Sequence, residues 1–255
     1  TQPLQPANAE QPNRQLSGNP PLGSSPETAY PEKKTIHQTQ STMTATQVSA
    51  RELFRNAYEN RYTWDANFPG YTADVTYKNG DTVVTGKAKV GADMKAEVHD
   101  VEDDTVQKAI HGQLWETAIH RVRREFESVH GDNTFSYGET DDSGAVGINI
   151  GGKGEGDRYQ LRDNEVCMVH RHIHGVVVTI HTQSSHDTGE GYLSHRYDSV
   201  YHDPKTGEQK GAKSDFEDEY TQVGDYWILS KRTIHSADSE TPQVFTFSNI
   251  QLLNA

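Results

Sequence analysis

GYTADVTYKNGDTVVTGKAKV, residues 70–90, is the stretch of sequence that decides the fold. Its first half alternates apolar and polar residues, with the apolar ones at Tyr71, Ala73, Val75 and Tyr77. This period of two is typical of a half-buried strand. The dipeptide Asn79-Gly80 follows, and it favours a tight two-residue turn. We therefore predict a β-hairpin whose return strand covers Thr82–Val90.

Further strands are predicted on both sides of a long helical segment. One follows the hairpin at Met94–Val98, and after Gly131 the candidates are Thr134–Tyr137, Ala145–Ile150, Asp157–Arg162, Glu165–His174, Val176–Thr182, Gly191–His202, Phe216–Val223, Tyr226–His235 and Val244–Leu252. Consecutive strands joined by short turns must be antiparallel. The predicted fold class is α+β, mostly β: a large curved antiparallel sheet, or half-barrel, wrapped around one or two helices. A closed barrel or a sandwich is the alternative.

Two helices are predicted from apolar residues at three- and four-residue spacing. The first covers Ala50–Tyr62 and begins with a capping box formed by Ser49 and Glu52. The second runs from Asp103 to about His130, with a bend or an interruption at Gly112. Its polar face includes a basic cluster, Arg121, Arg123 and Arg124, which is unusual in an acidic chain. A solvated helix face is the commoner explanation of such a cluster.

Composition excludes several classes of function. The chain has 24 basic and 37 acidic residues, a net charge of −13, which repels phosphate backbones and argues against nucleic-acid binding. No apolar run approaches the roughly 18 residues that cross a bilayer, so we predict no membrane span. The single cysteine, Cys167, excludes an internal disulfide framework.

Residues 1–45 differ in composition from the rest of the chain. They are rich in Pro, Gln, Asn and Ser and contain few large apolar residues, too few to offset the entropy lost on ordering. We predict a tail that is disordered or wraps a protein partner, with Leu4, Leu16, Leu22 and Tyr30 as anchors. Residues 46–255 are predicted to form one half-barrel domain. The start lacks the features of an uncleaved signal peptide, and Thr1 could follow removal of Met or of a targeting segment.

Histidines are the candidates for a metal site. The chain has 13, and His170, His172 and His174 share one face if residues 165–174 form a strand. Two of them, with a third ligand from a neighbour such as His181, His186 or His195, could bind one metal ion. All three in the row cannot, because the ends of the row are about 13 Å apart. A solvent-facing strand side explains the same sequence, and no motif such as HExxH is present.

No catalytic residues are predicted. The run GINIGGKGEGD lacks the Gly-Lys-Ser/Thr ending of a P-loop, and no Gly-x-Ser-x-Gly elbow occurs. Paired carboxylates such as Glu217 and Glu219 are abundant, but an acidic surface produces such pairs by chance. The sequence therefore predicts no cofactor and favours a protein that is not an enzyme.

Aromatic residues on the predicted strands suggest a hydrophobic cleft. A curved sheet with a helix across it often leaves room for an apolar ligand. The candidate cleft residues are Tyr71, Tyr77, Tyr197, Tyr201, Trp227 and Phe247. An aromatic core is the alternative explanation of the same residues.

Two segments carry a resemblance to known proteins. RELFRNAYENRYTWDANFPGYTADVTYKNG with VVTGKAKV, and DEYTQVGDYWILSKRTIHS with QVFTFSNIQLL, resemble the opening and closing parts of the LolA-like lipoprotein-carrier half-barrels. The segment from about Thr44 to Leu253 also resembles an uncharacterised family of unknown function from cyanobacteria and chloroplasts. The resemblance implies an open curved sheet around helices and a photosynthetic host. It implies no catalytic residues.

Three hypotheses about function follow. The first is a non-catalytic binding or scaffold protein whose tail tethers the half-barrel to a larger assembly, such as a photosynthetic complex. The second is a carrier of a hydrophobic small molecule such as a lipid or a pigment, and the third is a histidine-metal enzyme. The expected location is the cytoplasm or the chloroplast stroma, with peripheral association with the thylakoid.

Overall fold

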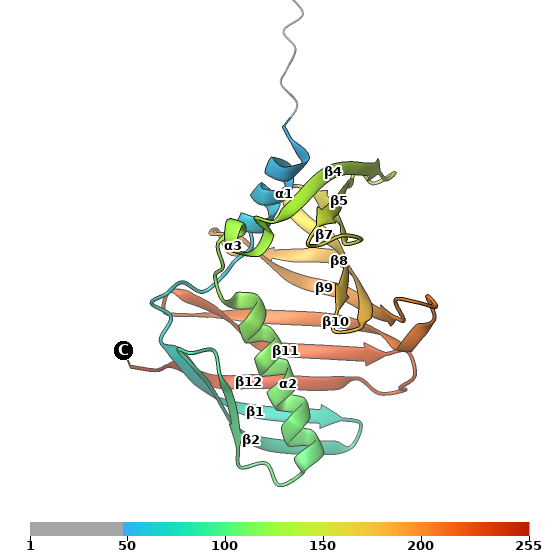
Figure 1. Ribbon diagram of the computed structural model, residues 1–255. Helices are drawn as coiled ribbons and strands as arrows, with labels where there is room; N and C mark the ends of the chain where they lie inside the picture. The colour runs from blue at the N-terminus through green and yellow to red at the C-terminus, as the bar shows by residue number, and fades with distance from the viewer. Residues whose placement is uncertain (1–47, 255) are drawn as a thin grey trace, which may run out of the picture. The chain divides into compact units, whose positions relative to one another are not determined.

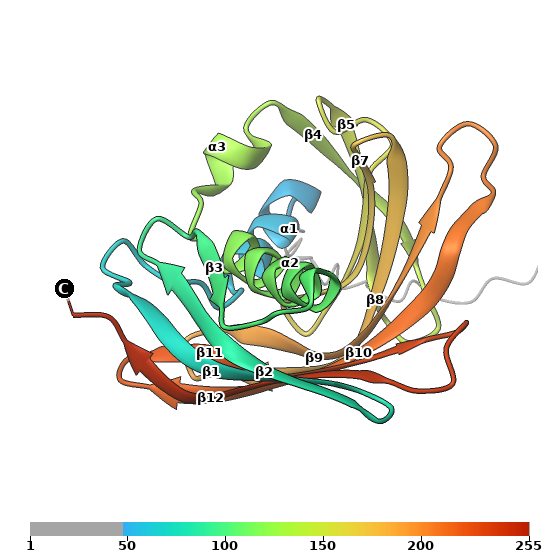
Figure 2. The same cartoon turned by 90° about the horizontal axis from the view of Figure 1, so that it is seen from below.

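The chain divides into two units, residues 1–45 and 46–255, and the computed structural model describes residues 48–254. Twelve strands of this part form one antiparallel sheet in the order β3-β2-β1-β12-β11-β10-β9-β8-β7-β6-β5-β4. They are β1 (Gly70–Asn79), β2 (Thr82–Gly91), β3 (Ala96–His99), β4 (Asn133–Thr140), β5 (Val146–Gly152), β6 (Arg158–Arg162), β7 (Glu165–Ile173), β8 (Val176–Asp187), β9 (Tyr192–His202), β10 (Gln209–Val223), β11 (Tyr226–Ser236) and β12 (Gln243–Leu252). The sheet is open and curves around α1 (Ala50–Glu59) and α2 (Asp104–Arg121) (Figures 1 and 2). The predicted fold class is confirmed.

The β1–β2 hairpin forms as its sequence predicts. Asn79 pairs with Thr82 across the turn, and Gly80 has a φ of 57°, which glycine adopts without steric cost. The other edge of β1 pairs with the end of the chain, with Tyr71 opposite Leu252. The last strand therefore lies between the first strand and β11, and this pairing joins the two ends of residues 70–252 in one sheet.

The helix α1 has the predicted capping box. The Ser49 hydroxyl accepts a hydrogen bond from the Glu52 backbone N–H, and the Glu52 carboxylate accepts one from the Ser49 backbone N–H. In α2 the Asp103 carboxylate accepts hydrogen bonds from the N–H groups of Thr105 and Val106. Both caps satisfy donors that a helix start leaves without an intrahelical partner.

The prediction of one helix from Asp103 to His130 is wrong at its C-terminal end. The helix α2 continues through Gly112 but ends at Arg121, and a separate short helix, α3 (Phe126–His130), follows. Between them, Val122 has an extended backbone with ψ of 126° and forms a β-bridge with Trp64. Trp64 is a buried side chain from the segment after α1, so a contact distant in sequence ends the helix.

Two separate hydrophobic cores lie on the inner, helix-facing side of the sheet. In the first, α2 residues such as Ile110 and Leu114 pack with β1 and β12 residues such as Val75 and Phe245. In the second, residues of α1 and α3 pack against β5 and β6, with Phe54 and Phe126 in contact with neighbouring aromatic rings. The two cores hold different helices against different ends of one sheet. Within the described residues no helix is long and apolar enough to cross a membrane.

Candidate functional site

The inner face between the two cores carries apolar side chains that belong to neither. They are Ile173 of β7, Val178 and Ile180 of β8, Tyr197 and Tyr201 of β9, and Phe216 of β10, which we call the inner strip. The register places them on the helix-facing side, since Ile180 pairs with Val169 of the second core and Tyr197 pairs with Phe216. Val178 is only 5% exposed, but Tyr201 is 44% exposed. The other members, Ile173, Ile180, Tyr197 and Phe216, are half-buried, so the inner strip keeps part of its apolar surface in contact with water.

A buried ion pair borders the inner strip on the α2 side. Arg232 of β11 donates two hydrogen bonds of 2.7 Å to the Asp218 carboxylate of β10, and the two residues are 4% and 1% exposed. A third donor of Arg232 reaches the Gln113 side-chain oxygen of α2 at 2.9 Å. This bidentate arrangement is the strongest geometry available to an arginine and a carboxylate. It holds α2 at a defined position over the sheet.

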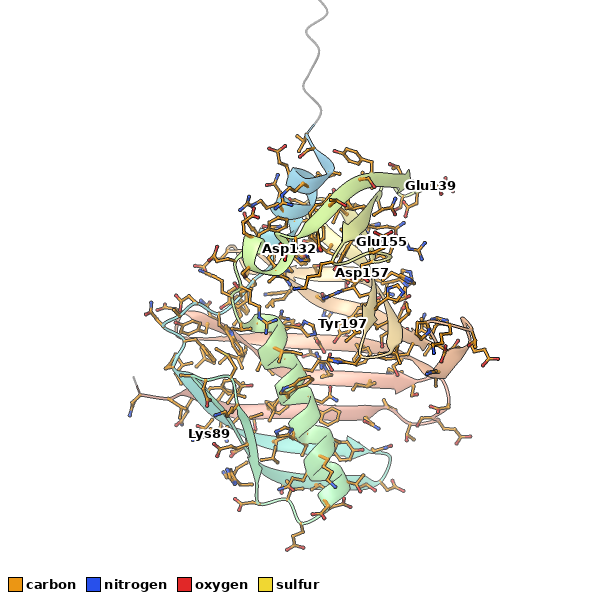
Figure 3. All side chains as sticks on the ribbon, in the orientation of Figure 1. Lys89, Asp132, Glu139, Glu155, Asp157 and Tyr197 are labelled. Carbon is orange, nitrogen blue, oxygen red and sulfur yellow. The ribbon has the colours of Figure 1, made fainter. Side chains whose placement is uncertain are left out.

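Two tyrosines connect this ion pair with the inner strip. The Tyr197 hydroxyl donates to Asp218 Oδ2 at 3.2 Å, and the Tyr220 hydroxyl donates to the Ser194 carbonyl at 2.8 Å. The Tyr197 ring stacks on Phe216, with centroids 4.7 Å apart and an interplanar angle of 3°. Burial raises the pKa of Tyr220 to about 12 and also raises the pKa of Tyr197 well above its ordinary value, so both hydroxyls stay neutral donors at physiological pH. Figure 3 shows Tyr197 beside the upper half of α2.

The other border of the inner strip is formed by charged residues of the second half of the sheet. Arg171 of β7 shares the inner face with Val169, and its Nε lies 3.5 Å from Asp157 Oδ2. Asp157 also accepts a hydrogen bond from the His172 backbone N–H at 2.9 Å. Figure 3 shows Asp157 close to Glu155 at the β5–β6 turn. The apolar side chains of the inner strip thus lie between two sets of charged residues, one on each side.

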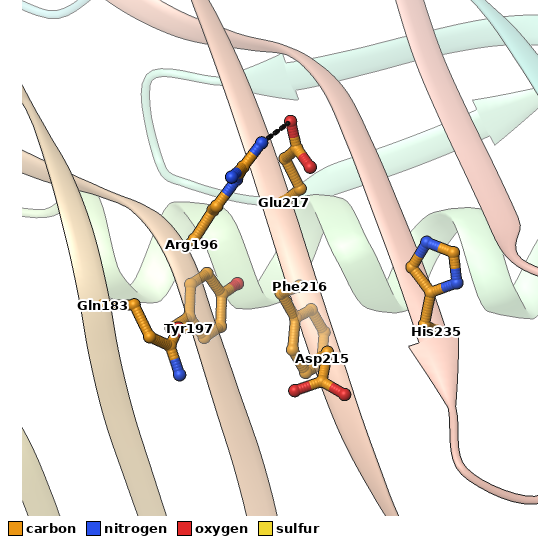
Figure 4. Close-up of a pocket in the computed structure, with 7 residues that line it drawn as sticks. All are labelled: Gln183, Arg196, Tyr197, Asp215, Phe216, Glu217 and His235. Carbon is orange, nitrogen blue, oxygen red and sulfur yellow. Dashed lines mark hydrogen bonds and ion pairs between the residues drawn. The ribbon is translucent and has the colours of Figure 1, made fainter.

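A shallow pocket of about 370 Å³ lies on the opposite, outer face of the sheet. Figure 4 shows it with α2 behind the strands. It is lined by the outer-face residues Gln183, Arg196, Asp215, Glu217 and His235, and also by the inner-strip residues Tyr197 and Phe216, which alternate with them along β9 and β10. Its charged groups are paired with their neighbours: Arg196 Nη2 lies 3.2 Å from Glu217 Oε1, and Lys213 lies 3.7 Å from Asp215. Paired surface charges of this kind contribute little to stability and fit a solvated outer face.

The predicted cleft residues fall into two groups. Tyr71, Tyr77 and Phe247 are at most 7% exposed and belong to the first core, and Trp227 packs against the same core. Tyr197 and Tyr201 belong to the inner strip. In the described conformation, an apolar ligand could therefore meet Tyr197 and Tyr201, whereas α2 covers the core residues. Sequence alternation cannot separate the groups, because both have the same period of two.

The predicted metal candidates lie on the outer face and each has a different partner. His170 Nδ1 is 2.9 Å from the Thr179 hydroxyl, His172 Nδ1 is 3.1 Å from Asp157, and His181 Nδ1 is 3.2 Å from Asp198. His174 is not on the strand: with a φ of 48° it forms the two-residue turn between β7 and β8 together with Gly175. Residues 48–254 contain no group of three or more His, Cys, Asp or Glu arranged to hold a metal ion. The predicted tail anchors, Leu4, Leu16, Leu22 and Tyr30, lie outside the described residues.

Sequence reasoning does not single out several residues in or beside the inner strip. It predicts Arg171, Arg232 and Ile180 only as parts of strands, and Asp218 is one of many carboxylates in the chain. The sequence holds a weak signal for Arg232, because a period of two places it on the same strand face as Ile228 and Ile234 in YWILSKRTI (residues 226–234). A charged residue at such a position requires a buried partner, but the sequence does not name that partner.

The solved structures that resemble this chain include three of low sequence identity. A domain described as a candidate outer membrane lipoprotein-sorting protein, from Vibrio parahaemolyticus, has 11% identity and a TM-score of 0.36, covering 81% of this chain and 93% of that chain. The LolA superfamily protein NE2245 from Nitrosomonas europaea has 10% identity and a TM-score of 0.31, covering 82% and 95%. A DUF1329 family protein from Desulfovibrio piger has 8% identity and a TM-score of 0.24, covering 80% and 91%. Scores this low carry no argument about function.

Comparison at the level of sequence places the chain in a family. No curated protein matches the chain significantly. The model described as "Protein of unknown function (DUF3386)" matches residues 45–253, which confirms the predicted membership in a family of unknown function. The predicted cyanobacterial or chloroplast source stays a prediction. The chain belongs to the DUF3386 family.

Proposed function

We propose that this protein is a non-catalytic binding protein that carries a hydrophobic small molecule on the inner strip. The observation that supports the proposal is that Ile173, Ile180 and Tyr201 face the inside of the sheet without belonging to either core. Covering such a surface with an apolar ligand is favourable, at about 25 cal/mol for each Å² removed from water. Helices cover both ends of the curved sheet, and in this proposal the ligand covers the inner strip between them.

The charged groups around the inner strip favour binding over catalysis. Asp218 uses both carboxylate oxygens on Arg232, and Asp157 accepts from His172 and lies near Arg171. Carboxylate oxygens that are already engaged by partners within the protein are not free to exchange a proton with a ligand, as a general acid or base must. Their role in this proposal is to hold α2 and the strands in place around the ligand.

The scaffold hypothesis depends on the tail, which lies outside the described residues. It stays a prediction, as do the proposed photosynthetic partner, the stromal or cytoplasmic location and the association with the thylakoid. The inner strip is the feature of residues 48–254 that favours one hypothesis over the others, and it favours the carrier.

Native mass spectrometry of the full-length protein, followed by organic extraction and identification of the extract, tests the carrier. We expect a non-covalent adduct of a hydrophobic molecule in wild type. Ile180→Asn places an amide on the inner strip and should reduce the adduct. The control is Gln183→Ala on the same strand, which changes an exposed residue of the outer-face pocket and should leave the adduct unchanged. An adduct equally abundant in all three proteins, or absent from wild type, would argue against the carrier.

A further inference from the structure

Some arginines of this acidic protein have no acidic partner. Within residues 48–254, Arg51, Arg55, Arg162, Arg171, Arg196 and Arg232 form ion pairs with carboxylates. The arginines that form none there are Arg61, Arg121, Arg123, Arg124 and Arg158. Carboxylates outnumber basic groups in this chain by 37 to 24, so a shortage of acidic partners does not explain this. Four of the five unpaired arginines lie in two short segments, 61–64 and 121–124.

Backbone hydrogen bonds hold these two segments side by side, and we call them the arginine junction. The Trp64 N–H donates to the Arg121 carbonyl at 2.6 Å, and the Arg123 N–H donates to the Trp64 carbonyl at 3.2 Å. Arg123 Nε also donates to the Thr63 hydroxyl at 3.0 Å. Trp64 is 1% exposed, so the crossing point is anchored in the first core. Figure 1 shows the chain leaving α1 passing the end of α2 here.

Two arginines of the junction are held on aromatic rings with most of their donors free. Arg61 lies 3.9 Å from the centre of the Tyr58 ring and donates Nε to the Tyr58 carbonyl at 2.9 Å. Arg121 lies 5.8 Å from the centre of the Tyr220 ring, and its Nη2 donates to the Tyr220 hydroxyl at 3.4 Å. The other guanidinium donors of both form no hydrogen bond within the described residues. A guanidinium has five donors, so each retains a fork that an anion can occupy.

The junction is connected to the inner strip through tyrosines. The Tyr220 hydroxyl, which Arg121 contacts, lies 3.4 Å from Asp218 Oδ2, and the Tyr197 hydroxyl contacts the same oxygen at 3.2 Å. A molecule bound along the inner strip would therefore have the guanidinium groups of the arginine junction at one of its ends.

We propose that the arginine junction binds the anionic head group, a carboxylate, sulfate or phosphate, of the hydrophobic ligand that the inner strip carries. The inference rests on the proposed function and specifies the ligand as an anionic amphiphile. The chemistry is direct: the planar fork of arginine matches carboxylate, sulfate and phosphate oxygens, and hydrogen bonds between charged groups are stronger than those between neutral ones.

The test compares three probes: dodecyl phosphate, dodecanol, which has the same chain without the charge, and inorganic phosphate. Affinities are measured below the aggregation limit of each amphiphile by displacement of a fluorescent hydrophobic probe, and by calorimetry for phosphate. The variants are Arg61→Gln and Arg121→Gln, alone and combined. Arg158→Gln is the control, because Arg158 is also without an acidic partner but is exposed and lies on β6. Circular dichroism and thermal unfolding confirm that each variant is folded, and Arg61→Lys, which keeps the charge, replaces Arg61→Gln if that variant unfolds.

Wild type should bind dodecyl phosphate at least about tenfold more tightly than dodecanol, and each glutamine substitution should remove about that factor without changing dodecanol binding. Arg158→Gln should behave as wild type. Equal binding of both amphiphiles that is unchanged in the variants would overturn the head-group site but leave the carrier intact. If neither amphiphile binds wild type, both proposals fail. Tight binding of inorganic phosphate with no gain from the dodecyl chain would show a free-anion site and contradict an amphiphilic ligand.

Discussion

At the scale of single residues, the Arg232–Asp218 pair is the most consequential interaction in the described structure. Removing two charges from water is costly, and their mutual attraction offsets this only when the geometry is good and the remaining donors are satisfied. Here both conditions hold, since two 2.7 Å hydrogen bonds join the pair and Gln113 accepts a third from Arg232. The pair therefore specifies how α2 sits on the sheet, because a displaced helix would leave Arg232 incompletely bonded.

Substitution of one partner should be far more damaging than substitution of both. Arg232→Met leaves the buried Asp218 carboxylate without its counter-charge and should lower the free energy of unfolding by about 3–5 kcal/mol. The double variant Arg232→Met with Asp218→Leu should recover most of this loss. Urea denaturation of the two single variants and the double variant measures the coupling. A double variant as unstable as the sum of the singles would show that the two residues act independently.

His130 should make stability depend on pH below neutrality. It is 5% exposed, its ring lies about 5 Å from those of Phe54 and Tyr58, and the Asn133 amide lies 3.2 Å from its Nδ1. Burial, and then the nearby Arg171, lower its pKa to about 4. The unfolded chain, with a pKa of about 6.5, takes up the proton first, so stability present above pH 6.5 is lost as the pH falls towards 4. The full loss is about 3 kcal/mol.

Denaturation curves between pH 7.5 and pH 4.5 check this prediction. His130→Phe removes the titrating group and should make the dependence on pH less steep over this interval. His111→Gln changes an exposed histidine of α2 and should keep the wild-type slope. A His130→Phe slope as steep as that of wild type would assign the acid sensitivity to other groups.

At the scale of elements, features encoded by neighbouring residues were predictable, and features set by distant contacts were not. Ser49 with Glu52 predicts the start of α1, and Asn79-Gly80 predicts the β1–β2 turn, because each signal involves residues within a few positions. The end of α2 at Arg121 depends on a β-bridge to Trp64. Nothing in the residues around 121–130 indicates that bridge, so periodicity alone extends the helix too far.

The cap of α2 offers a test at this scale. Asp103 accepts hydrogen bonds from two backbone N–H groups at 2.8 and 3.0 Å, and Asp103→Ala should lower the free energy of unfolding by about 1 kcal/mol. Asp104→Ala, one residue further on, removes a charge near the same helix start without removing the cap and should cost less. Equal losses in the two variants, measured by chemical denaturation, would mean that charge rather than capping matters here.

At the scale of the described molecule, the order of the strands in the sheet could not be predicted from the sequence. Short turns predict that neighbouring strands are antiparallel, but the placement of β12 between β1 and β11 brings together residues as distant as Tyr71 and Leu252. The inner strip depends on the same long-range arrangement. Ile180 and Val75 both lie on alternating strands, yet α2 packs over Val75 and neither core includes Ile180. Which apolar residues remain uncovered is decided by where the helices lie.

Location of a bound hydrophobic probe tests the central claim most directly. The full-length protein would be irradiated with a long-chain alcohol that carries a diazirine, and the modified peptides would be mapped by mass spectrometry. The neutral head group makes the result independent of the arginine junction. The account predicts adducts on β8 and β9, at Val178, Ile180 and Tyr201 or their inner-face neighbours, and competition by unlabelled alcohol. Adducts confined to the outer-face residues Gln183, Arg196 and Glu217, or labelling that excess alcohol does not reduce, would contradict it.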